Sequence, residues 1–279
     1  MAHFNKQDML VGQLYSHHGL NEIYGHLIVA AILFLVSVVC AALLYRLFQK
    51  TQIEWPALLY AFIYTGLIGL GEFAEHFFTD TFLNTVLHYT HLLAAPGAMV
   101  FFYLAIREYH YKCSYPDEEL NTVSNEASMG VFVTIITITV LLGGLAGTPW
   151  DETLEGPVLI VILLPMIALS ALLIRAAGKI DKSNLTVYFP VFGAVLSGLT
   201  LTIWIGRFAD VHQIAMLYIA AHSLQNVFHA GMATLILLFT RMIRREIRDD
   251  TLFKCRVNEL SKHWEKKLEP KRRFNLDEQ

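Results

Sequence analysis

Residues 71–91, GEFAEHFFTDTFLNTVLHYTH, carry a high density of ionisable side chains between two long apolar runs. Neutral imidazole and carboxylate are the usual protein ligands of zinc, copper and iron. An ionisable group inside a bilayer is costly and normally faces the interior of a helix bundle. The stretch therefore indicates a buried site that binds a metal ion or handles protons. Its ionisable residues are Glu72, Glu75, His76, Asp80, His88 and His91.

Polar side chains recur three or four residues apart in three places, so each set shares one face of a helix. The sets are Glu72 with His76, His88 with His91, and His222 with Asn226 and His229. Three such faces turned toward one interior make a convergent site. The candidate metal ligands are Glu72, His76, His88, His91, His222 and His229.

Four further residues fall on the same side of the predicted membrane. Glu75, Asp210 and His212 are candidates for orienting the ligands or handling protons in catalysis. His26, near the start of the first apolar run, is a candidate for an additional ligand.

Three kinds of chemistry fit this cluster. The first is a zinc, copper or iron ion in a metal-dependent oxidoreductase or hydrolase of the membrane. The second is haem b in an electron-transfer protein, with His91 and His229 as axial ligands at matched depth. The third is a proton- or metal-coupled transporter, since chains of glutamate and histidine form proton pathways. The residues do not decide between an enzyme and a transporter.

The composition predicts an all-α integral membrane protein that crosses the bilayer several times. The chain has 279 residues, of which 55% are hydrophobic and 16% are charged, with a mean hydropathy of +0.47. Soluble domains carry about 25% charged residues, and a span needs about 20 apolar residues. Seven spans are predicted, at 26–48, 57–79, 84–106, 129–147, 156–176, 187–206 and 213–240.

The distribution of lysine and arginine predicts the orientation. All of the 21 basic residues except Lys6 and Arg207 fall in segments on one side, and that side is expected to be cytoplasmic. Residues 1–25 are then an extracytoplasmic segment, 26–240 the membrane domain, and 241–279 a charged helical tail in the cytoplasm. The expected partners are the lipid bilayer and further membrane subunits, and no nucleic acid is expected.

Two short motifs suggest an internal repeat. The second predicted helix ends in GEFAEH (71–76) and the sixth in GRFADVH (206–212). The repeats would cover 25–112 and 156–248, which gives a 3+1+3 arrangement of parallel units with the fourth helix as the connector. Each unit would contribute histidines and a carboxylate to one pseudo-symmetric site.

The three cysteines, Cys40, Cys113 and Cys255, are far apart and form no CxxC motif, so neither a disulfide framework nor a cysteine metal site is predicted.

In outline, the layout resembles the seven-helix zinc hydrolases related to alkaline ceramidases, with His76 and a pair of histidines on the last helix. The chain departs from that pattern at Glu72 and Asn226, where the family has serine and histidine. We therefore assign no family and carry no activity over.

Overall fold

The computed structural model describes residues 20–75, 81–115, 164–181, 184–212, 214–254 and 256–257, together with the single helical positions 134, 137 and 141. Within these residues the fold is helical, apart from one pair of two-residue strands. The five long helices are α2 (Leu20–Thr51), α3 (Pro56–Glu75), α4 (Thr81–Ser114), α7 (Tyr188–Val211) and α8 (Ala215–Arg248).

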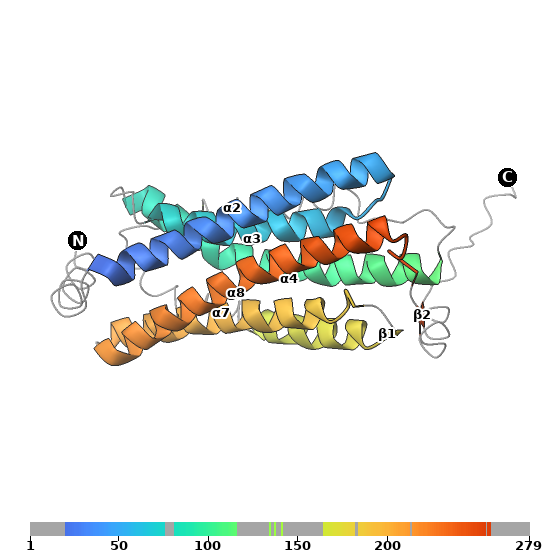
Figure 1. The fold of residues 1–279 in the computed structure, drawn as a ribbon. Coiled ribbons are helices and arrows are strands. Elements are labelled where there is room, and N and C mark those ends of the chain that lie inside the picture. The colour runs from blue at the N-terminus through green and yellow to red at the C-terminus, as the bar shows by residue number, and fades with distance from the viewer. Residues whose placement is uncertain are drawn as a thin grey trace, which may run out of the picture.

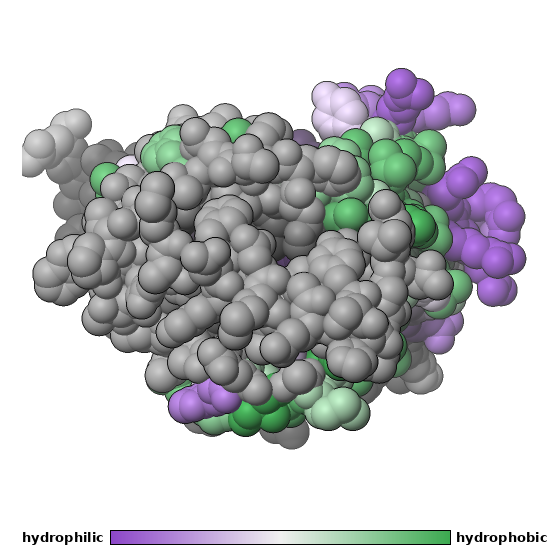
Figure 2. Space-filling model, turned by 90° about the vertical axis from the view of Figure 1, so that its left-hand side faces the viewer, coloured by the Kyte–Doolittle hydropathy of each residue, from purple (hydrophilic) through white to green (hydrophobic). Residues whose placement is uncertain are grey.

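These five helices are long and apolar enough to cross a membrane, so the chain has the character of a membrane protein. Large apolar side chains point outward from them, such as Leu35 (58% exposed) and Val227 (64% exposed). Figure 2 shows hydrophobic side chains, in green, on the flanks of the bundle. Burial in lipid rather than in protein accounts for such an outer surface.

Five of the seven predicted spans are therefore confirmed as helices. Of the other two, the span at 156–176 overlaps a shorter apolar helix at Leu164–Ala177. The remainder of that range, and most of 129–147, lie outside the described residues. The number of seven spans, the internal repeat and the orientation stay predictions.

The helices lie side by side with alternating direction, and α8 lies between α2 and α7 (Figure 1). The contact between α2 and α3 depends on Gly69. A Cβ atom at this position would lie 2.5 Å from the carbonyl oxygen of Ala30 and 2.8 Å from the amide nitrogen of Phe34. Only glycine lets the two backbones approach this closely, as in other membrane helix pairs.

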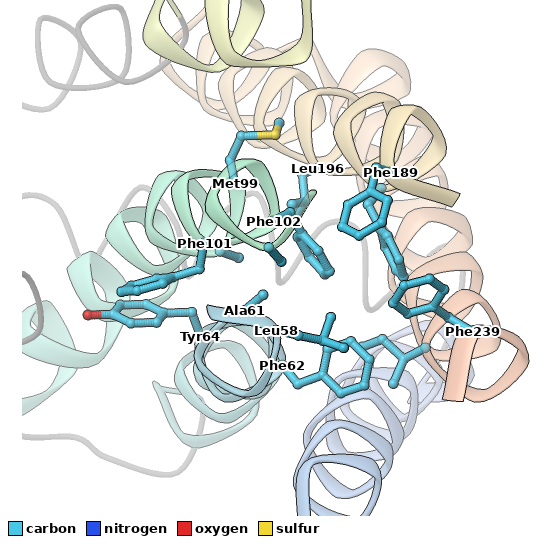
Figure 3. Packing of buried hydrophobic residues seen from close by; sticks show 14 of the residues in the cluster. Leu58, Ala61, Phe62, Tyr64, Met99, Phe101, Phe102, Phe189, Leu196 and Phe239 are labelled. Atoms are coloured by element: carbon cyan, nitrogen blue, oxygen red, sulfur yellow. The ribbon is translucent and has the colours of Figure 1, made fainter. Parts of the chain in front are cut away.

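A cluster of aromatic side chains forms the centre of the bundle (Figure 3). Phe102 of α4 stacks on Phe192 of α7, with 4.2 Å between ring centroids and 12° between planes. Phe239 of α8 meets the edges of Phe189 and Phe192 at 5.4 Å and 5.5 Å. These offset and edge-to-face contacts join three helices without any polar group.

Two buried hydrogen bonds fix the start of α3 against α4. The indole Nε1–H of Trp55 donates to the carbonyl oxygen of Ala105 (2.9 Å). The backbone N–H of Ala57 donates to the Glu108 carboxylate oxygen Oε2 (3.3 Å). The first turn of a helix has amide groups without helical partners, and here a side chain from the neighbouring helix satisfies one of them.

The C-terminal tail differs from its prediction. The helix α8 continues past residue 240 but ends at Arg248, because residues 249–254 turn back toward the bundle. Phe253 packs against Trp55 and Tyr109. The strand β2 (Arg256–Val257) then pairs antiparallel with β1 (Ile180–Asp181). The predicted helical tail is therefore correct only as far as Arg248 within the described residues.

The cysteines also differ in part. Cys40 is a buried free thiol, as expected. Cys113, in the last turn of α4, is disulfide-bonded, which the spacing of the cysteines did not indicate.

Candidate functional site

The start of α2, the end of α3 and the start of α8 meet at one end of the bundle (Figure 1). His26 of α2 and Glu72 of α3 are buried there, with 6% and 4% of their surface exposed. The imidazole Nε2 of His26 is hydrogen-bonded to the carboxylate oxygen Oε1 of Glu72. Either atom can act as the donor of this hydrogen bond, depending on the tautomer of the ring.

The other ring nitrogen of His26 faces α8. Its Nδ1–H donates to the amide oxygen Oδ1 of Asn226 at 2.6 Å. Asn226 lies on one helical face between His222 and His229. The ring centroids of these two histidines lie 5.9 Å and 6.0 Å from that of His26. Three imidazoles, one carboxylate and one amide are thus gathered from three helices.

The ring of His222 is oriented by a hydrogen bond to its own helix. Its Nδ1–H donates to the backbone carbonyl oxygen of Tyr218, one turn earlier, at 3.1 Å. In the neutral ring the Nε2 atom then carries the lone pair, which is the form that binds metal ions. Gly206 of α7 gives the ring its space, since a Cβ there would lie 3.4 Å from the His222 Cε1 atom.

Close backbone contacts determine where these side chains lie. Gly69 is one turn before Glu72, and the Ala30 carbonyl that it approaches is one turn after His26. The α2–α3 distance at this level therefore determines whether imidazole and carboxylate meet. On the other side, the Phe228 ring lies against Gly198 of α7, where a Cβ would be 2.4 Å from its Cζ atom. This contact fixes the rotation of α8 at the residue before His229, which is fully buried.

The remaining predicted ligands are placed only by their backbone or not at all. His88 and His91 are helical positions of α4, one turn before the buried Leu92 and Ala95. Their side chains are outside the described part of the structure, and His76 lies entirely outside it.

Of the three predicted proton-handling residues, only His212 has a side chain in the described part of the structure. Glu75 is the last residue of α3 and Asp210 belongs to α7, but neither side chain is among those described. His212 follows α7, is exposed, and packs its ring against Phe208 at 4.3 Å between centroids.

Two features of the site go beyond the predicted ligand set. His26 is central, although the spacing of the sequence gives it only a supporting role. Asn226 is predicted only to share a helical face with His222 and His229, without a function of its own. Its hydrogen bond to His26 joins residues 200 positions apart. Its position between two histidines on one face is the only signal in the sequence that indicates its role.

Among the described side chains, no three His, Cys, Asp or Glu groups are arranged to hold one metal ion. Both nitrogens of His26 are hydrogen-bonded to oxygen atoms, of Glu72 and of Asn226. Comparison with known protein families, with characterised proteins and with solved structures gives no match for this chain.

Proposed function

We propose that the protein is a membrane metalloprotein, either a metal-dependent enzyme or a redox subunit. The ligands of its transition-metal ion are His26, His222 and His229. Glu72 orients His26, and His88 and His91 of α4 are candidates for completing the site from the same end of the bundle.

The observation that supports this proposal is the central place of His26 between two imidazoles of α8. Two imidazoles on one tetrahedral ion, at metal–nitrogen distances of about 2.0–2.1 Å, have ring centroids about 5 Å apart. The separations of 5.9 Å and 6.0 Å are somewhat larger, so the rings must turn and move closer together to bind an ion. For an ion to bind, the hydrogen bond between His26 Nδ1 and Asn226 Oδ1 must break, so that the Nδ1 atom can coordinate the ion.

The Glu72 carboxylate adds a second argument. Metal-binding histidines usually donate their other ring N–H to a carboxylate or carbonyl oxygen, which fixes the ring and raises its basicity. His26 has this arrangement through Nε2 and Glu72, and His222 has it through Nδ1 and the Tyr218 carbonyl. Two of the three proposed ligands are thus oriented before any ion binds.

The donor set indicates the type of ion and the range of reactions. Imidazole ligands suit zinc, copper and iron, and no thiolate is needed. With zinc, the centre would supply a bound water for hydrolysis, and Glu72 is the nearest described carboxylate to accept its proton. With copper or iron, it would supply a redox couple. The identity of the metal therefore selects the reaction class.

The test is elemental analysis and visible spectroscopy of the full chain purified in detergent, before and after addition of Co²⁺ as a spectroscopic probe. Wild-type protein should bind about one ion per chain, with d–d absorption bands of a nitrogen-ligated site. His26→Ala, His222→Ala and His229→Ala should each lose most of this occupancy. His212→Ala is the matched control because its imidazole is exposed near the same end.

Three results would contradict the proposed ion site. Full occupancy in the His222 and His229 variants would exclude them as ligands. An equal loss in the His212 variant would indicate adventitious binding. A Soret band would move the assignment to haem b, with His91 and His229 as its axial ligands.

A second candidate function is proton transfer, and the buried hydrogen bond between His26 and Glu72 supports it. Purified protein that holds neither metal nor haem would favour this alternative. Wild-type protein in liposomes should then dissipate an imposed pH gradient, and Glu72→Gln should stop it, because the amide cannot accept the proton. A wild-type protein that leaves the gradient intact would rule proton transfer out.

A further inference from the structure

A groove of about 830 Å³ lies at the opposite end of the bundle from the histidines, where α8 passes the end of α2 and the start of α7. Its lining combines apolar side chains with a cluster of arginines. The lining residues are Leu47, Tyr188, Leu238, Arg241, Met242, Arg244, Arg245, Ile247, Arg248 and Asp249.

Two of the arginines have no acidic partner among the described side chains. Asp249 forms an ion pair with Arg245 at 3.5 Å and accepts a hydrogen bond from Arg248 at 3.1 Å, so its negative charge is already paired. Arg241 and Arg244 form no ion pair with any side chain in the described part of the chain, and both are exposed. The groove therefore carries a strong positive charge, which favours an anionic ligand.

The apolar part of the groove is continuous with the outer surface of the bundle. Leu238, one turn before Met242, is 45% exposed, and its neighbour Leu237 is 50% exposed. Along α8 the residues change from apolar to basic between these leucines and Arg241. Such a change marks the level at which a membrane helix passes from the hydrocarbon to the headgroups.

We propose that this groove binds a phospholipid with an anionic headgroup. The guanidinium groups of Arg241 and Arg244 hold the phosphate, because their planar arrays of N–H donors fit its oxygens. An acyl chain lies along Leu238 and Leu47. A free phosphate ion would use only the arginines and leave the apolar wall unoccupied, so the combined lining favours a lipid. This inference does not depend on the proposed metal centre.

The test is native mass spectrometry of the full chain in detergent, titrated with phosphatidylglycerol or with phosphatidylcholine of the same acyl chains. Wild-type protein should bind phosphatidylglycerol more tightly. The double variant Arg241→Gln/Arg244→Gln should weaken that binding roughly 25-fold, since each basic side chain near an anionic headgroup contributes about fivefold. The control is Arg46→Gln/Arg107→Gln, which removes the same charge from exposed positions outside the groove.

The possible results separate this site from the alternatives. Selective loss in the groove variant, with the control unchanged, would support the proposal. An equal loss in both variants would show a diffuse charge effect and overturn it. Equal affinity for the two lipids would also overturn it. Displacement of phosphatidylglycerol by low millimolar inorganic phosphate would assign the groove to a free anion instead.

Discussion

The two halves of the bundle are held together by different interactions. At the histidine end, His26, Glu72 and Asn226 join three helices through hydrogen bonds between buried polar groups. From the centre of the bundle to the other end, aromatic contacts such as that of Phe102 with Phe192 are the main interactions, and two hydrogen bonds join the start of α3 to α4. Buried polar networks specify one arrangement of their members, whereas apolar packing supplies stability with less directional demand. We therefore expect stability and ligand binding to be separable by mutation.

The largest expected effect on stability is in the aromatic half. Phe102→Ala removes a ring that is fully buried and stacked, and should lower the free energy of unfolding by about 3–5 kcal/mol. Phe102→Leu, which keeps most of the volume, should cost much less. Titration with sodium dodecyl sulfate in mixed micelles measures both. If Phe102→Ala lost less than Phe102→Leu, the aromatic cluster would not be the stabilising centre.

The contact at Gly69 should give the next largest effect, and it acts on the histidine end. Gly69→Ala places a methyl group against the backbone of α2, and such overpacking costs about 1–3 kcal/mol. The helices must separate, so metal or proton binding that depends on His26 and Glu72 should fall as well. Gly231→Ala is the control because nothing lies within 4 Å of a Cβ atom there. Equal effects of the two changes would show that the α2–α3 approach is unimportant.

Asn226→Ala sharpens the comparison because it should lower stability without weakening ion binding. Loss of the amide oxygen removes a buried hydrogen bond to His26, which should cost about 1–2 kcal/mol of unfolding free energy. The same change releases the Nδ1 atom of His26 for an ion, so the dissociation constant for Co²⁺ should not rise. A large rise would make Asn226 a ligand rather than a competitor.

The smallest predicted effect is at the start of α3. Trp55→Phe keeps an aromatic ring but removes the donor to the Ala105 carbonyl, which should cost about 1 kcal/mol. Ligand binding at the histidine end should be unchanged, as measured by Co²⁺ titration. A coupled loss of binding would show that the two halves are not independent.

Hydropathy was sufficient to predict the five long helices, because each carries a run of apolar residues that spans a bilayer. Helical spacing was sufficient to place His222, Asn226 and His229 on one face. Neither signal could predict that His26 meets Glu72, since those residues lie 46 positions apart on different helices. That contact depends on how closely α2 approaches α3 at Gly69, which is a property of packing in three dimensions. The end of α8 at Arg248 was missed for a similar reason, because Phe253 turns back onto Trp55 and Tyr109.

The bonds at the start of α3 also bear on how the chain enters the membrane during synthesis. The Ala57 amide and the Trp55 indole find their acceptors on Glu108 and Ala105, about 50 residues later in translation. An isolated α3 has neither of these acceptors. The start of α3 therefore reaches its final hydrogen bonds only after α4 has been synthesised and has packed against it.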